Sequence, residues 1–148
     1  HKITQVVRAM ENPSSVAQPL GRYSQLTRVK SQEMLYLAGQ VAMDAGSNMV
    51  GVGDVVAQVR QVYENIGNVL ESAGATFRNV IQFTTYLSGR DLIGLFMTER
   101  NRIVDELYPD DDFPPSTLVI IDSLMNEEML LEVTSSTKKV MKMNNKKL

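Results

Sequence analysis

Few side chains of this sequence could carry out chemistry, because it contains no cysteine and only one histidine, His1, at its first position. Thiol catalysis, disulfides and cysteine-ligated metals are excluded, and one chain cannot build a Ser-His-Asp triad or a histidine-based zinc site. Glu132 lies in the apolar run of residues 130–133, where a carboxylate must be paired or face outward. Arg22 and Tyr23 are adjacent in a loop, where an arginine is most often solvated and a tyrosine most often packs. Any function of these groups depends on the elements that position them.

Length, charge and hydropathy predict a single domain that neither binds nucleic acid nor inserts into a membrane. The 148 residues are close to the number expected of a single domain, so we expect one over residues 1–148. The net charge of −2 gives no general attraction to nucleic acid. No apolar run approaches the ~20 residues needed to cross a bilayer, and the first residues lack the apolar core of a signal peptide. We expect a soluble cytoplasmic protein with a frayed tail from about Lys138, a segment that holds five lysines.

Three segments rich in branched and apolar residues precede the first helix. They lie at residues 3–10, 25–29 and 34–42 and are typical of strands. The last of them begins with a nearly unbroken apolar run at residues 34–38. Such a run suits a strand that is covered on both faces.

An amphipathic helix follows these strands. Asp54 is placed to accept hydrogen bonds from the free amides of the first turn, and Gly74 can take the left-handed conformation that ends a helix. Apolar residues recur between them at steps of four and three, which predicts one buried helical face made of Val55, Val59, Val62, Ile66, Val69 and Ala73.

The second half of the chain repeats the alternation of strand and helix. Residues 79–87 predict a strand, and Asp91 is the expected cap of a second helix whose inward residues are Leu92, Leu95, Phe96, Ile103 and Leu107. A loop rich in proline and aspartate at residues 108–115 leads to strands at 117–121 and 129–134. The order βββ-α-β-α-ββ predicts an α+β domain with a single sheet and two helices on one of its faces.

Several short segments, in order along the chain, resemble the motifs of one family. They are Gly-Arg-Tyr-Ser-Gln at 21–25, Leu-Ala-Gly-Gln-Val at 37–41, residues 58–74, Phe-Pro-Pro-Ser-Thr at 113–117 and Leu-Glu-Val at 131–133. The chain is thereby similar to the RidA family, also called YjgF-like or endoribonuclease L-PSP. The resemblance implies a chorismate-mutase-like fold and a homotrimer whose sheets form a central barrel. It also implies small-molecule pockets between neighbouring subunits, with no metal and no cofactor.

The resemblance assigns roles to three residues. Tyr23 would contribute to the pocket, and Gly39 would present backbone groups to a ligand that approaches closely because glycine lacks a Cβ. Glu132 would be the catalytic residue, positioning or activating water for attack on an imine carbon. Gly39 has a second interpretation, since an isolated glycine in a strand often marks a bulge.

The chain departs from the family pattern at three positions in or near these motifs. Ser116 stands where the family has an arginine that binds the carboxylate of an imino acid in a bidentate pair. Phe96 stands where many members carry an asparagine, which makes that wall apolar, and Arg22 replaces a common proline. A charge-assisted hydrogen bond contributes roughly 1.5–3 kcal/mol, so its loss should weaken carboxylate binding by one to two powers of ten. Arg22 is the candidate replacement, unless it faces solvent.

Three functions remain open. The first is hydrolysis of a small imine, enamine or related C–N bond, with low activity expected toward 2-iminopropionate and 2-aminoacrylate because of Ser116 and Phe96. The second is a trimer that binds a ligand or acts as a scaffold without catalysis. The third, a ribonuclease, has the least support, because the sequence offers neither an internal histidine nor a strongly basic character.

Overall fold

The computed structural model describes residues 8–30 and 33–139. Its elements are strands β1 (Arg8–Glu11), β2 (Leu26–Val29) and β3 (Glu33–Gln40), helix α1 (Val55–Ser72), strand β4 (Val80–Leu87), helix α2 (Ile93–Leu107), and strands β5 (Ser116–Ile120) and β6 (Leu131–Lys139). Short 3₁₀ turns, η1 (Phe77–Asn79) and η2 (Arg90–Leu92), precede β4 and α2. The predicted order of strands and helices is therefore confirmed. Residues 3–7 of the expected first strand lie outside the described residues.

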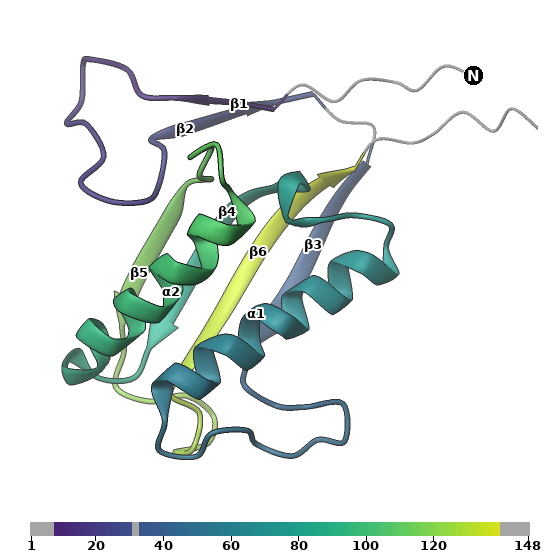
Figure 1. Ribbon diagram of the computed structural model, residues 1–148, viewed down its shortest axis with the longest axis vertical. Helices are drawn as coiled ribbons and strands as arrows, with labels where there is room; N and C mark the ends of the chain where they lie inside the picture. Colours follow the sequence, from purple (N-terminus) through teal and green to yellow (C-terminus); the bar gives the residue numbers. More distant parts are fainter. Residues whose placement is uncertain (1–7, 31–32, 140–148) are drawn as a thin grey trace, which may run out of the picture.

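The strands form two sheets, so the prediction of a single sheet is wrong. Four of them make the main sheet in the order β3-β6-β4-β5, with β4 and β5 parallel and the other pairs antiparallel. The strands β1 and β2 pair only with each other and lie beyond one end of the main sheet (Figure 1). Arg8 anchors this hairpin there, because its guanidinium donates to the Val80 carbonyl at 3.0 Å and to Asp112 at 2.8 Å.

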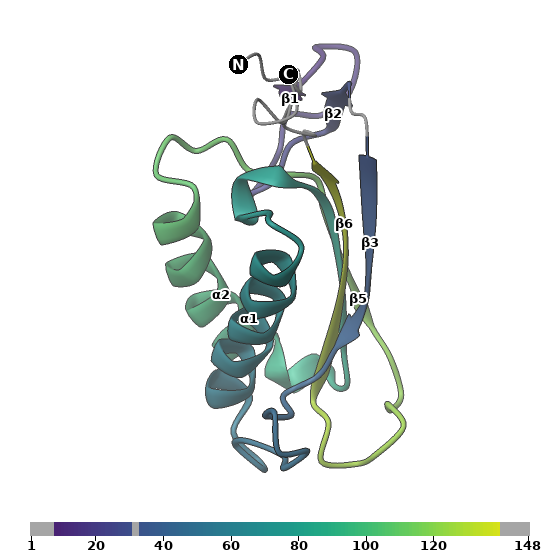
Figure 2. The ribbon, with the colours of Figure 1, turned by 90° about the vertical axis from the view of Figure 1, so that its right-hand side faces the viewer.

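Both helices cover the same face of the main sheet, as predicted (Figure 2). The Asp54 carboxylate accepts a hydrogen bond from the Ala57 amide at 3.2 Å, and Gly74 ends α1 with a φ of +74°. Most of the predicted face of α1 is buried. Val69 is 38% exposed, and Leu70, one turn beyond Ile66, takes its place in the core. Ala73 is only partly buried and is the C-cap that follows α1.

Helix α2 differs from its prediction at both its start and its buried face. Asp91 lies in η2, and the residue that caps α2 is Leu92, without a side-chain hydrogen bond. Leu95 is 60% exposed rather than buried. The buried stripe of α2 instead contains Phe96, Glu99, Arg100 and Val104, so two charged residues enter the interior.

Strand β6 continues through Lys139 and pairs with β3, so the predicted tail begins too early. Lys138 is only 4% exposed, and burial lowers the pKa of its amine. Residues 140–148 lie outside the described residues.

No described helix or strand covers the face of the main sheet opposite the helices (Figure 2). Tyr36 of β3 is 77% exposed, and Val119 of the edge strand β5 is 38% exposed. The proposed homotrimer would cover this face and stays a prediction. Among the described residues, no helix is both long and apolar enough to cross a membrane.

Candidate functional site

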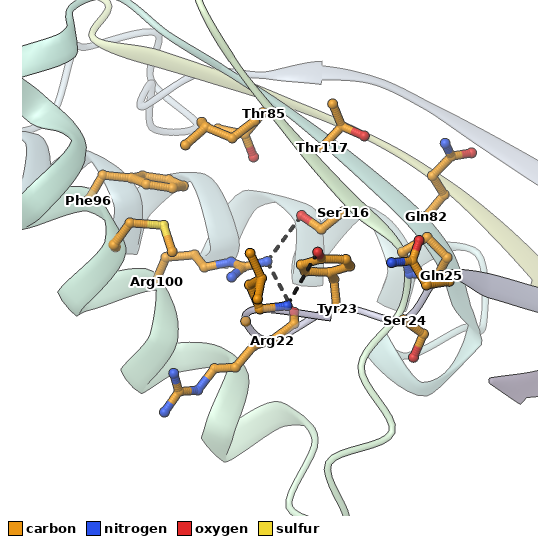
Figure 3. Close-up of a pocket in the computed structure, with 15 residues that line it drawn as sticks. Arg22, Tyr23, Ser24, Gln25, Gln82, Thr85, Phe96, Arg100, Ser116 and Thr117 are labelled. Carbon is orange, nitrogen blue, oxygen red and sulfur yellow. Dashed lines mark hydrogen bonds between the residues drawn. The ribbon is translucent and has the colours of Figure 1, made fainter. Parts of the chain in front are cut away.

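A pocket of about 730 Å³ lies beside the edge strand β5 (Figure 3). Three parts of the chain that are distant in sequence line it: residues 20–25 before β2, one face of α2, and residues 115–118 at the start of β5. Gln82 and Thr85 of β4 complete the lining. Two of the family-like segments thus meet at one pocket.

Arg100 of α2 brings a guanidinium to this pocket. Its Nη2 atom donates to the Ser116 hydroxyl at 3.0 Å and to the Arg22 carbonyl at 3.5 Å (Figure 3). Its Nη1 atom donates to the Asn101 side chain at 3.3 Å. Arg100 is only 8% exposed. All three acceptors are neutral, and the nearby Asp105 carboxylate makes its hydrogen bonds to Arg22. Among the described residues, Arg100 therefore has no hydrogen-bonded anionic partner, and its guanidinium can bind an anion.

The neighbouring charged residue, Glu99, does not neutralise Arg100. It accepts a hydrogen bond from Arg60 Nε at 2.8 Å and others from the Arg102 guanidinium. These arginines hold the pKa of the Glu99 carboxyl near 2. Glu99 is therefore an anion that pairs with Arg60 and Arg102. It does not line the pocket.

Arg22 lines the pocket with its backbone rather than with its guanidinium. The side chain extends away from Ser116 (Figure 3) and makes a bidentate pair with Asp105, through Nε at 2.7 Å and Nη2 at 3.1 Å. This pairing lowers the pKa of the Asp105 carboxyl. Arg22 was the expected replacement for the missing arginine, but the geometry gives that place to Arg100.

The segment that carries Tyr23 is tied down at several points. The Ser24 hydroxyl donates to the Phe113 carbonyl at 2.7 Å and so joins two of the family-like segments directly. Gln25 donates through its side-chain amide to Ala17 at 2.8 Å. The Tyr23 hydroxyl accepts from the Leu20 amide at 3.4 Å. Tyr23 therefore lines the pocket from an anchored loop, and its role in binding a ligand stays a prediction.

Phe96 forms an apolar part of the same pocket wall. Its ring is 1% exposed and comes from the turn of α2 that precedes Arg100 (Figure 3). Residues four apart on a helix lie on one face, so the same face offers a ring and a cation. The pocket thus brings together Arg22, Tyr23, Phe96 and Ser116 among the predicted site residues.

Glu132 and Gly39 lie together elsewhere, and neither lines this pocket. Glu132 alternates along β6 with the buried Leu131 and Val133, so its side chain lies on the open face of the sheet. A Cβ on Gly39 would lie 1.9 Å from Glu132 Oε2. The pairing of β3 with β6 also shifts next to Gly39. The bulge interpretation of this glycine fits the irregular pairing of the strand, and the absence of a Cβ also makes room for the Glu132 carboxylate; contact of Gly39 with a ligand stays a prediction.

Arg100 was not among the predicted site residues, although the sequence contains a signal for it. Arg100 follows Phe96 by four residues, and Phe96 was expected to face inward. A charged residue on a predicted buried face requires a reason. Among the described residues, no group of three or more His, Cys, Asp or Glu side chains is placed to hold a metal ion.

Comparisons with known proteins identify the family. Residues 14–137 match the family model described as Endoribonuclease L-PSP. The chain is 30% identical over 115 residues to a RutC family protein of Pyrococcus horikoshii, a match that covers 78% of this chain and 85% of that protein. It is 29% identical over 92 residues to the 2-iminobutanoate/2-iminopropanoate deaminase of Mus musculus, which covers 62% of this chain and 67% of the deaminase.

Solved structures show the same fold. A protein of unknown function from the Rid family of Yersinia pestis has a TM-score of 0.78 at 26% identity, over 89% of this chain and 98% of that one. Yeast Mmf1 has a TM-score of 0.64 at 18% identity, over 91% of this chain and 99% of that one, and supports the fold alone. Because the matched family model spans most of the sequence, the chain belongs to the RidA/YjgF-like family, whose model carries the description Endoribonuclease L-PSP.

Proposed function

We propose that the protein hydrolyses a small imine, an enamine or a related C–N bond in an anionic substrate bound beside β5. The observation that carries this proposal is the Arg100 guanidinium, which is buried, makes its hydrogen bonds to neutral acceptors within the described part of the chain, and donates to Ser116 in the pocket. It supplies the cation that the family-like motif lacks. Relatives named 2-iminobutanoate/2-iminopropanoate deaminases support the reaction class.

The substrate carboxylate would accept hydrogen bonds from Arg100, whose planar fork fixes the orientation of a carboxylate. Water adds to the carbon of the C=N bond and gives a carbinolamine. The C–N bond then breaks, ammonia leaves with the proton, and a carbonyl forms, so R–C(=NH)–COO⁻ and H₂O become R–C(=O)–COO⁻ and NH₃. No oxidant or reductant is needed. An enamine enters the same route after a proton shift to the imine.

Glu132 is the proposed residue that directs the water. Within one chain it lies on the open face of the sheet, outside the pocket lining. We propose that a homotrimer covers this face and places Glu132 of one chain at the pocket of a neighbouring chain. The catalytic site is then complete only in the assembly.

One observation favours a second function, ligand binding without catalysis. Glu132 rests against Gly39 and does not reach the pocket of its own chain. If the assembly leaves it there, the pocket can hold an anion but has no carboxylate to direct water. A ribonuclease is not proposed, because a net charge of −2 gives no general attraction to RNA.

Kinetics of two variants separate these functions. Imines would be made in the cuvette from amino acids by an amino-acid oxidase, and their decay compared with the spontaneous rate. Arg100→Gln should mainly raise KM, whereas Glu132→Gln should mainly lower kcat, by a factor of about 100 or more. Arg90→Gln is the matched control, since Arg90 is exposed and does not line the pocket. If the parent does not accelerate decay but binds the 2-oxo acid products, the ligand-binding function is the correct one.

A further inference from the structure

The pocket has a polar end and an apolar end. Arg100, Ser116 and Tyr23 supply the polar lining, and the guanidinium donates to the Ser116 hydroxyl. Phe96, Met97 and Leu118 contribute the apolar lining. Leu118 of the edge strand is 38% exposed, so this part of the lining has apolar surface still to bury. A ligand that fills both ends must be an anion with an apolar group.

The volume indicates how large that group is. At about 730 Å³, the pocket lies in the range of sites that hold a drug-sized ligand, roughly 300–1,000 Å³. The side chain of 2-iminopropanoate is a single methyl group and would leave the exposed surface of Leu118 and the partly exposed Met97 uncovered, with the buried Phe96 behind them. Burying further apolar surface there contributes about 25 cal/mol per Å².

The replacement of the family's arginine by Ser116 leaves space in the pocket for a larger side chain. A guanidinium carried by β5 itself would project into the pocket from its edge. Ser116 is short, and its hydroxyl accepts from Arg100, which arrives from the helix at the side of the pocket. The cation is retained while the volume in front of β5 stays open.

We infer that the site prefers 2-imino acids, or the corresponding enamines, whose side chain is large and apolar, branched or aromatic. The carboxylate lies on Arg100, and the side chain lies against Phe96, Met97 and Leu118. The inference rests on the proposed function for the reaction, but the binding preference holds without catalysis. Ser116 is then a residue that determines specificity through its size.

The test is direct binding of the unreactive products, measured by isothermal titration calorimetry with the full-length protein. The series is pyruvate, 2-oxobutanoate, 4-methyl-2-oxopentanoate and phenylpyruvate, with phenylpyruvamide as the uncharged partner of the last. Affinity should rise along the series, and phenylpyruvate should bind at least tenfold more tightly than pyruvate, since one methylene in an apolar pocket discriminates by 10–200-fold. Phenylpyruvamide should bind at least tenfold more weakly than phenylpyruvate.

Two variants locate the apolar end. Leu118→Asn should reduce the preference for phenylpyruvate over pyruvate at least threefold. Phe96→Leu should also reduce this preference; it keeps the buried position apolar and so provides a test if Leu118→Asn fails to fold. Circular dichroism reports the fold of each variant. Arg90→Gln should leave the whole series unchanged.

Equal or tighter binding of pyruvate would overturn the inference. So would a preference that survives in both folded variants, or an absence of binding by every oxo acid at millimolar concentration. Loss of imine turnover with the binding preference intact would instead overturn only the proposed function, so the two failures are distinguishable.

Discussion

The guanidinium of Arg100 donates to the hydroxyl of Ser116 across 3.0 Å. The two residues belong to α2 and β5, and Ser116 stands where the family motif has its arginine. A cation is therefore kept at this place in the fold although its position in the sequence has changed. The motif at residues 113–117 lacks a carboxylate-binding group, and Arg100 is the proposed substitute.

Moving the guanidinium back to β5 tests this relationship. Ser116→Arg alone should destabilise the protein, because it places a second cation beside the buried Arg100. The double variant Ser116→Arg with Arg100→Ser should recover stability, with a coupling free energy of about 0.5–3 kcal/mol, the range for residues in contact. Urea unfolding of the four proteins in the cycle measures it. Additive effects would show that Arg100 and Ser116 do not share one site.

Gly39→Ala should destabilise the protein by about 1–3 kcal/mol, as overpacking does. The added Cβ would meet Glu132 Oε2 at 1.9 Å. The same substitution in a Glu132→Ala background should cause a smaller loss, because the colliding carboxylate is then absent. Gly94→Ala is the matched control: nothing lies within 4 Å of its Cβ, and alanine favours a helix, so stability should rise. Thermal unfolding of the four variants would refute the prediction if both Gly39→Ala losses were equal.

Acid should remove the stabilisation that comes from Glu99. Hydrogen bonds from Arg102 and Arg60 lower the pKa of its carboxyl from 4.5 to about 2. The folded protein therefore holds this proton less well than the unfolded chain, and the stabilisation is complete above pH 4.5 and disappears as the pH falls to 2. We expect roughly 1–2 kcal/mol, because the two arginines are half exposed and solvent screens them.

Urea unfolding between pH 7 and pH 2 measures this effect by comparing the parent with Glu99→Gln. The difference in the free energy of unfolding between the parent and Glu99→Gln should become smaller as the pH falls. Glu106→Gln is a suitable control, since Glu106 is exposed and pairs only with Arg102 among the described residues. If this difference does not change with pH, the ionised Glu99 carboxylate does not contribute the predicted stabilisation.

The open face of the sheet should be an interface. Light scattering at micromolar concentration should give the mass of a trimer, because Tyr36 and the edge of β5 leave apolar surface exposed on the face opposite the helices. Tyr36→Glu should shift the mass toward the monomer. Leu95→Glu adds the same charge to an exposed apolar residue on α2 and should leave the mass unchanged. A monomer mass for the parent protein would refute both the trimer and the proposed catalytic site that depends on it.

Local patterns were enough to predict much of the fold. The spacing of apolar residues in α1 and the cap at Asp54 depend on neighbours within one turn, and both are confirmed. The cap at Asp91 was wrong, because a 3₁₀ turn intervenes and local propensity does not distinguish such a turn from the first turn of a helix.

Contacts between distant residues could not be predicted in the same way. The hairpin of β1 and β2 lies beyond the main sheet because Arg8 reaches Asp112, more than a hundred residues away. The buried position of Arg100 likewise depends on Ser116 and on the Arg22 carbonyl, which are brought to it by tertiary structure. The parts of the candidate site that belong to sequence motifs were therefore predicted. The cation was missed, because it comes from α2, outside those motifs.

One of the bonds made by Arg100 ends on a main-chain atom, the carbonyl of Arg22. Every amino acid, including proline, offers that acceptor. The side chain at position 22 can therefore change over evolution while this tether of the pocket wall remains. The loop is free to acquire new recognition chemistry by substitution, and Arg22, turned toward Asp105 in this chain, is an example of such an exchange.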